Sequence, residues 1–322
     1  MRFRINHVTR YEYAEPVSLC HSIAHLKPPQ TARQRCLSSQ IRVDPWPAVH
    51  REHEDFFGNR VSYFSIQQAH DALEVRAQSE VEVVAPTLPM PEATQPWERI
   101  VDRLHDRYDE PMTGLRIFTL PSPLVPPDPD ARAFAAESFL PGRPILEATI
   151  ELMGRIYRDF VYDPTSTTIA TPLAEVMEQR KGVCQDFAHV AIAGLRGLGL
   201  ATRYVSGYLE TLPPPGQVKL QGADASHAWF SVLIPNLGWI DFDPTNDQIP
   251  GEQHITTAVG RDFQDVTPLR GIFYGGGTHE LRVAVDVNRV APPGSETSDV
   301  GEPTAPGPRP PASPPSSQSQ SG

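Results

Sequence analysis

Cys184, His227 and Asp243 are the residues of this sequence whose types and spacing best suit nucleophilic catalysis. Cys184 opens an apolar-rich segment, 184–198, whose pattern predicts a helix. The free N–H groups and the positive end of a helix stabilise a thiolate, and the thiolate is the nucleophilic form of cysteine. A cysteine at this position can also be no more than a small residue packed at the start of an apolar helix.

His227 and Asp243 lie at the ends of two predicted strands. His227 opens the segment 226–234, which is apolar on both faces as in a central strand, and Asp243 closes the segment 239–243. A short turn, PNLG, joins the segments, so an antiparallel pair would bring both side chains within hydrogen-bonding reach. Asp241 has the same strand parity and competes as the acid, and Asp243 can also be a simple turn former before Pro-Thr. Together with a nucleophile on a helix, this order is the layout of a Cys-His-acid triad.

The charge and cysteine content argue against several classes of protein. The 322 residues carry a formal net charge of −11 and no dense run of Lys and Arg, unlike a nucleic-acid-binding surface. Three cysteines are too few and too irregularly spaced for a disulfide framework or a CxxC metal site. The N-terminus lacks the apolar stretch of a signal peptide, and no apolar run approaches the ~20 residues that span a bilayer. We therefore expect a cytoplasmic protein with no membrane contact.

Histidine spacing gives little support for a metal site. His21 and His25 are spaced i, i+4, and His50 and His53 lie close together. Neither pair has an acidic or cysteine partner at a usual zinc spacing, and no calcium-binding loop is evident. We expect no metal and no cofactor.

The apolar pattern divides the chain into three regions. Residues 1–86 alternate apolar and polar residues, most strictly over 73–83, and predict an antiparallel β domain with one solvated face. After a proline-rich connector, residues 97–290 form the predicted catalytic region. Residues 291–322 are Pro, Ser, Gly and Gln with almost no apolar residues, which predicts a disordered tail. Within the middle region we predict helices over 97–108, 129–139, 145–160, 171–179 and 184–198, and strands over 203–209, 226–234, 239–243 and 281–287.

Several segments resemble one known family. GVCQDFAH, RYVSGYL and SHAWFSVLIPNLGWIDFDPTN closely resemble the transglutaminase-like core of bacterial proteins that are often labelled cysteine proteases. HLKPPQTARQ and FFGNRV resemble the β domain that precedes this core in one bacterial subfamily, and GRDFQDVTPLRGIFYGGGTHELRVAVDV resembles its closing segment. The resemblance covers roughly residues 1–290. It implies an α+β fold, in which an antiparallel β domain precedes a papain-like core of helices packed on an antiparallel sheet.

The resemblance also implies roles for individual residues. It makes Cys184 the nucleophile, His227 the base and Asp243 the orienting acid of a thiol-dependent enzyme that cleaves peptide or isopeptide amides through a thioester. The backbone N–H of Cys184 would donate to the oxyanion, and Gln185 and Tyr162 are candidates for a second donor. Further candidates for contact with substrate are Asp186, which can instead cap the helix, and Trp229, which can pack around the triad or simply fill the core.

Two other functions remain open at this point. The thioester could pass to an amine, as in a cross-linking transglutaminase acting on protein glutamine, or the core could bind peptide without turnover. We favour hydrolysis, because amine transfer needs a site that excludes water and nothing in the sequence identifies one. Relatives in the family tend to occur beside ATP-grasp-type ligases, which implies a small peptide or amide conjugate as substrate.

Overall fold

The computed structural model of the chain describes residues 1–168, 171–211 and 226–290. Its largest sheet contains seven strands, and β1 lies at its centre. The predicted tail, 291–322, lies outside the described residues. The first five strands are β1 (Arg2–Lys27), β2 (Gln34–Asp44), β3 (Val49–Glu54), β4 (Arg60–Ile66) and β5 (His70–Val83), in the order β2-β5-β1-β4-β3.

The alternation read from the sequence matches the buried face of this sheet. Leu73, Val75, Ala77, Val81 and Val83 of β5 are all buried, with exposed fractions of 0–2%. A strand with one solvated face needs this period of two, since successive side chains point to opposite faces. β1 is long enough to pair with two partners on each side, because its first half contacts β5 and β13 and its second half contacts β4 and β12.

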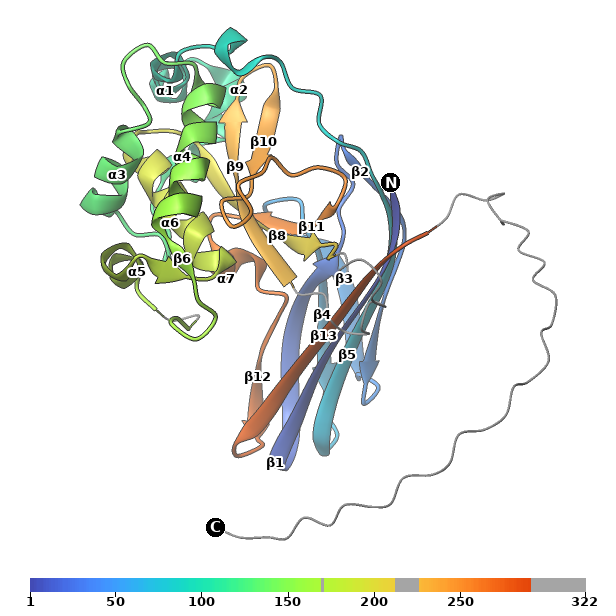
Figure 1. The fold of residues 1–322 in the computed structure, drawn as a ribbon. Coiled ribbons are helices and arrows are strands. Elements are labelled where there is room, and N and C mark those ends of the chain that lie inside the picture. The colour runs from blue at the N-terminus through green and yellow to red at the C-terminus, as the bar shows by residue number, and fades with distance from the viewer. Residues whose placement is uncertain (169–170, 212–225, 291–322) are drawn as a thin grey trace, which may run out of the picture. The chain divides into compact units, whose positions relative to one another are not determined.

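The end of the described chain returns to its beginning. Strands β12 (Leu269–Gly275) and β13 (His279–Arg289) both pair with β1 in antiparallel fashion, and Figure 1 shows them beside it. The sequence analysis assigned this segment to the region 97–290, but the structure places both strands in the first sheet. Alternation of apolar and polar residues predicts that a segment is a strand but does not identify the strand with which it pairs. Here Val285 and Val287 share an apolar cluster with Phe3 and Ile5, which favours the pairing of β13 with β1.

A four-stranded antiparallel sheet carries the residues of interest. Its order is β10-β9-β8-β11, so β9 is an inner strand, as its two apolar faces predicted. The strands are β8 (Thr202–Leu209), β9 (Ser226–Ile234), β10 (Gly238–Phe242) and β11 (His254–Gly260); β6 (Val161–Tyr162) and β7 (Lys181–Gly182) form a separate short parallel pair. In Figure 1 the helices α1 to α6 lie together on one side of the four-stranded sheet.

The helices match the predicted ones in place, with ends that differ by a few residues. They are α1 (Trp97–His105), α2 (Glu110–Thr113), α3 (Pro129–Ala136), α4 (Ile145–Asp159), α5 (Leu173–Gln179), α6 (Cys184–Gly197) and α7 (Phe263–Val266), with short 3₁₀ helices η1 (Pro91–Ala93) and η2 (Arg116–Thr119). Helix α5 begins two residues after the predicted start at 171, since Pro172 is the residue before its first turn. The helix is followed by Arg180, whose positive φ of 54° makes it a left-handed cap.

Helix α6 is buried along almost its whole length, which explains its apolar composition. It packs between strands β8 and β9 and the helices α3, α4 and α5. A side chain at Gly194 would bring a Cβ within 2.7 Å of Ala135 and 2.8 Å of the Ala131 carbonyl oxygen, so glycine is needed for α3 to approach this closely. The helix that begins with Cys184 is therefore held on several sides.

Side-chain amides join the two sheets along the edge strand β11. Gln34 exchanges two hydrogen bonds with the backbone of Thr256, at 2.9 and 2.8 Å, and Asn59 does the same with Val259, at 2.7 and 2.8 Å. Each amide pairs with the backbone as a neighbouring strand would, which satisfies the edge of the sheet. These contacts hold β11, and with it His254, in place.

Among the described helices, none is both long and apolar enough to cross a bilayer.

Candidate active site

The start of α6 is held by Asp186. Its carboxylate accepts hydrogen bonds from the backbone N–H of Val183, at 2.8 Å, and from the hydroxyl of Thr167, at 2.7 Å. A Cβ at Gly182 would come within 2.7 Å of this carboxylate, so the glycine makes room for Asp186. Asp186 is 4% exposed and has the capping contact considered for it in the sequence analysis. Cys184, two residues earlier in the same turn, is partly exposed and opens the helix.

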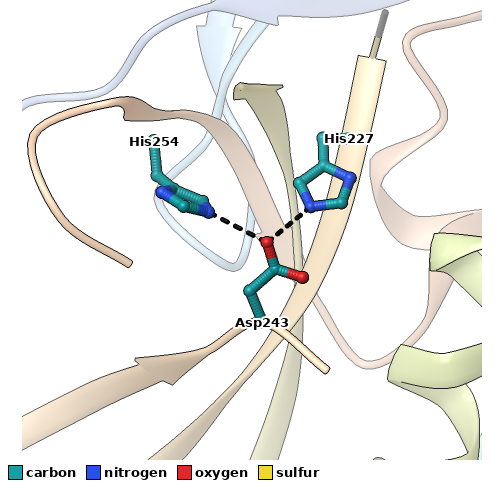
Figure 2. A group of neighbouring side chains, drawn as sticks. All are labelled: His227, Asp243 and His254. Atoms are coloured by element: carbon teal, nitrogen blue, oxygen red, sulfur yellow. Dashed lines mark hydrogen bonds and ion pairs between the residues drawn. The ribbon is translucent and has the colours of Figure 1, made fainter. Parts of the chain in front are cut away.

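His227 and Asp243 meet across the hairpin of β9 and β10. Phe242 lies opposite Phe230 in the register, which places Asp243 just beyond the end of β10, on the side of the hairpin where β9 begins. The distance from His227 Nε2 to Asp243 Oδ2 is 2.8 Å (Figure 2). An ionised carboxylate can only accept, so Nε2 carries the proton and donates it.

Asp243 is fully buried and accepts four hydrogen bonds. Besides His227, its Oδ2 atom accepts from Asn246 Nδ2 at 2.7 Å and from His254 Nε2 at 3.0 Å. Its Oδ1 atom accepts from the backbone N–H of Thr245 at 3.0 Å. A buried carboxylate with this many donors is stabilised in its charged form. Although burial on its own would raise the pKa of Asp243, the bonds from His227 and His254 hold that pKa far below its usual value.

The pKa of His227 depends on burial and on its neighbours Asp243 and Cys184. Burial on its own would lower the pKa of His227, but hydrogen bonds to Asp243 and to Cys184 outweigh burial and raise the pKa to about 10. Nε2 is bonded to Asp243, so Nδ1 is the ring nitrogen that this contact leaves free. The imidazole therefore lies against the buried carboxylate, the thiol at the start of α6 contributes to its raised pKa, and it is charged at neutral pH.

His254 is the residue that the sequence analysis missed. It is 3% exposed, its Nε2 atom bonds Asp243 from the side opposite His227, and Figure 2 shows the two rings flanking the carboxylate. The run His-Ile-Thr-Thr-Ala-Val is rich in β-branched residues and could have predicted strand β11. That the strand lies at the far edge of the sheet, with its histidine reaching Asp243, has no signal in the sequence.

The structure separates Asp241 from Asp243. Asp241 accepts a hydrogen bond from the hydroxyl of Ser231, and its carboxylate lies 4.0 Å from the guanidinium of Arg33. The described contacts of Asp241 do not include His227. Of the two candidate acids, Asp243 is the one bonded to the imidazole.

Three further candidate residues, Tyr162, Gln185 and Trp229, differ in their surroundings. Burial raises the pKa of Tyr162, and the charge of Cys184 raises it further, so the phenol lies near the sulfur. Gln185 is partly buried, and its side chain forms no hydrogen bond within the described part of the chain. Trp229 is fully buried, and its ring packs edge-on against His254 with centroids 5.2 Å apart. Trp229 thus fills the space beneath the two histidines.

His227, Asp243 and His254 also form a group that could hold a metal ion, since their donor atoms lie within 4.8 Å of one another. Both imidazole nitrogens lie at hydrogen-bonding distance from the same carboxylate oxygen, which is the arrangement of two N–H donors on one acceptor. The histidine pairs considered in the sequence analysis are not part of this group, and the expectation of no metal remains a prediction.

The raised pKa of His227 makes the stability of the chain depend on pH. An unfolded imidazole titrates near ~6.5, whereas folded His227 titrates near about 10, so the folded form holds more protons between these values. The stabilisation is complete below the lower value and is lost as the pH rises through the upper one. We expect the Tm of the wild type to fall by several degrees more than that of His227→Gln between neutral and alkaline pH. The Tm of each protein is measured by circular dichroism at each pH. An equal fall in Tm for the wild type and His227→Gln would show that the pKa of His227 is not raised.

Removing His254 should weaken the hold on Asp243. We expect His254→Leu, which cannot donate, to slow alkylation of Cys184 about tenfold, because a hydrogen bond to a charged group contributes roughly 1.5 kcal/mol. His254→Asn keeps an N–H donor and should retain more of the rate. The rate is measured by mass spectrometry after timed exposure to iodoacetamide, and equal rates for the leucine and asparagine variants would contradict a role through the donor.

Comparisons with known proteins agree with this fold. The family model of the bacterial transglutaminase-like N-terminal region matches residues 3–82, and that of the transglutaminase-like superfamily matches residues 132–244. An uncharacterised protein of Mycobacterium tuberculosis is 43% identical over 296 residues, covering 89% of this chain and 92% of the relative. The solved structure of a candidate cysteine protease from Cytophaga hutchinsonii has a TM-score of 0.66 at 22% identity, covering 89% of this chain and 90% of its own.

A more distant relative has a named activity. A protein-glutamine gamma-glutamyltransferase of Pseudomonas aeruginosa is 28% identical over 197 residues, which cover 57% of this chain but 28% of the relative. The fold and the matched regions define a transglutaminase-like protein with an N-terminal β region before its core. The chain belongs to the transglutaminase-like superfamily.

Proposed function

We propose that this protein is a thiol-dependent acyl-transfer enzyme that cleaves peptide or isopeptide amide bonds through a thioester on Cys184. One observation carries the proposal. The ring of His227 bonds the buried, charged Asp243 through Nε2, and the pKa of His227 is raised by Cys184 as well as by Asp243, which supports a thiol beside the ring. This is the relation of nucleophile, base and orienting acid that acyl transfer needs.

Each group has a defined part in the reaction. His227 holds the proton of Cys184, so the sulfur is available as a thiolate, and the thiolate attacks the amide carbonyl carbon to form a C–S bond. When the tetrahedral intermediate collapses, the C–N bond breaks and His227 delivers its proton to the leaving amine. Neutral His227 then takes a proton from water, which attacks the thioester and releases the acid and the thiolate. Asp243 keeps the ring oriented and stabilises its positive charge throughout.

The start of α6 supplies a donor for the oxyanion. The backbone N–H of Cys184 lies in the first turn, where helix N–H groups have no partner within the helix. A negative oxygen is stabilised at this end of a helix. We propose Tyr162 as the second donor, because its phenol lies near enough to Cys184 for the charge of the sulfur to raise its pKa.

Selective alkylation tests the nucleophile. At near-neutral pH we expect iodoacetamide to label Cys184 and to leave Cys20 and Cys36 unlabelled, since burial raises the pKa of both and keeps them as thiols. The two buried cysteines are thus internal controls in the same sample. Peptide mapping by mass spectrometry reads out all three sites. Labelling of Cys184 no faster than that of Cys36 would rule out an activated thiol and favour a binding module.

Amine transfer is the second candidate function, favoured by the named activity of the Pseudomonas relative. The partial exposure of Cys184 favours water as the second reactant. A panel of peptide and isopeptide amides, assayed with and without a primary amine, separates the two outcomes. Release of free acid in the presence of amine supports hydrolysis, whereas an amine-linked product supports transfer.

A further inference from the structure

A cavity of about 900 Å³ lies between the seven-stranded sheet and the four-stranded sheet. Its walls come from the chain around β2, β4 and β5 and from strands β8, β10 and β11. The residues that matter for its chemistry are Arg33, Arg60, Arg203, Trp239, Asp241 and His254. We call this space the arginine cavity. The triad residues proposed above do not line it.

The lining of the arginine cavity has an excess of positive charge. Three guanidinium groups, from Arg33, Arg60 and Arg203, face two carboxylates, from Glu54 and Asp241. The two carboxylates balance two of the three guanidinium groups, so one positive charge is left over. This excess stands out in a chain whose formal net charge is −11, and it is the charge that one bound anion would neutralise.

Arg203 is the group that carries the excess. Its guanidinium lies over the ring of Trp239, 4.5 Å from the centroid, and its Nε atom is buried without a hydrogen-bond partner. Within the described residues it forms no hydrogen bond and no ion pair. Burial lowers the pKa of Arg203 to about 10, and the charge of Asp241 only partly opposes this effect. A desolvated guanidinium without a counter-ion is costly, and structures normally pair such a group.

His254 gives a second, independent sign of an absent partner. It is 3% exposed and lines the cavity, and its Nδ1 atom is buried without a hydrogen-bond partner. Nε2 of the same ring is bonded to Asp243, so Nδ1 is the ring nitrogen left without a partner among the described residues. A ligand hydroxyl, a ligand N–H or a water molecule would satisfy it.

We propose that the arginine cavity binds a small molecule through an oxyanion group, a carboxylate or a phosphate, that pairs with Arg203. The planar guanidinium presents parallel N–H donors that match two oxygens of such a group. The ring of Trp239 packs against one face of the Arg203 guanidinium, which fixes its orientation and leaves the N–H groups at its edge for the ligand. This binding site does not depend on the proposed acyl transfer.

The position of Trp239 provides the measurement. Titration of the full chain with succinate, N-acetylglycine or inorganic phosphate, at ionic strength held constant with chloride, should change tryptophan fluorescence saturably for at least one anion. Saturation with the carboxylates and not with phosphate would identify a carboxylate ligand, and the reverse would identify a phosphate. Isothermal titration calorimetry of the same samples gives the Kd without relying on fluorescence.

Matched arginine variants decide whether the site is the arginine cavity. Arg203→Gln should weaken binding at least tenfold and leave the Tm unchanged or higher, because it removes an unpaired guanidinium. Arg35→Gln is the control, since Arg35 is 67% exposed and pairs with Glu82 on the surface. Should the glutamine variant fail to fold, Arg203→Lys, which keeps the charge and loses the planar pair of donors, should bind more weakly than wild type.

Two results would overturn the proposal: no saturable binding of any of the three anions, or equal Kd values for the wild type and the folded Arg203 variant. Cys184→Ala should bind the anion as wild type does. Loss of catalysis with retained anion binding in Cys184→Ala would affect only the proposed acyl transfer. Loss of anion binding with retained catalysis in Arg203→Gln would affect only the arginine cavity.

Discussion

Replacing Cys184 by alanine is expected to abolish cleavage of peptide and isopeptide amides. The change removes one sulfur atom at the start of α6, and no other described thiol lies beside an imidazole bonded to a buried carboxylate. The side chain is partly exposed and small, so the Tm should change by only a few degrees. Activity is measured on whichever amide of the panel the wild type cleaves, and folding is checked by circular dichroism.

Cys36→Ala is the matched control for this experiment. Cys36 is 9% exposed and lies on β2, in the first sheet, so its loss should leave activity within about twofold of wild type. Full activity of Cys184→Ala would mean that the chemistry does not pass through this sulfur, whatever the substrate.

Asp243→Asn is expected to lower kcat by ~10³–10⁴-fold while the chain remains folded. An asparagine cannot hold the proton of His227 on Nε2 as the carboxylate does, because its single oxygen would have to serve donors that two oxygens served before, and its NH₂ group can only donate. A neutral ring whose proton is no longer fixed on Nε2 can take the other tautomer, in which it cannot accept the thiol proton of Cys184. The variant also loses the charge that stabilises imidazolium, so its His227 pKa should fall.

Asp241→Asn separates the two candidate acids. Asp241 contacts Ser231 and lies near Arg33, away from the imidazole, so this variant should keep activity within about threefold of wild type. Comparison of kcat and of Tm for both variants decides the assignment. A crippled Asp241→Asn beside a mildly affected Asp243→Asn would transfer the role of the acid to Asp241.

Local patterns in the sequence predicted much of the fold. The strict alternation over 73–83 gave the buried face of β5, and the two apolar faces of 226–234 gave an inner strand. The PNLG turn led correctly to an antiparallel hairpin, and the α+β class followed from the resemblance. These features depend on residues close together in the chain, where period and turn chemistry decide the structure.

Contacts between distant segments were beyond reach of the same reasoning. The pairing of β12 and β13 with β1 joins the two ends of the described chain, and alternation does not name a partner strand. His254 reaches Asp243 because Gln34 and Asn59 hold β11 against the first sheet. Arg203 belongs to a strand whose sequence is unremarkable, and its unpaired state appears only in three dimensions. Sites made by tertiary packing in this way require coordinates.

Detection of an acyl group on Cys184 tests the central claim most directly. The full chain is incubated with 4-nitrophenyl acetate, quenched in acid and analysed by intact-mass and peptide-mapping mass spectrometry, with His227→Gln and Cys184→Ala in parallel. The account predicts one acetyl group on the peptide containing Cys184, removed by hydroxylamine, formed much more slowly in His227→Gln and absent from Cys184→Ala. No acetylation of Cys184, or acetylation equally fast without His227, would contradict it.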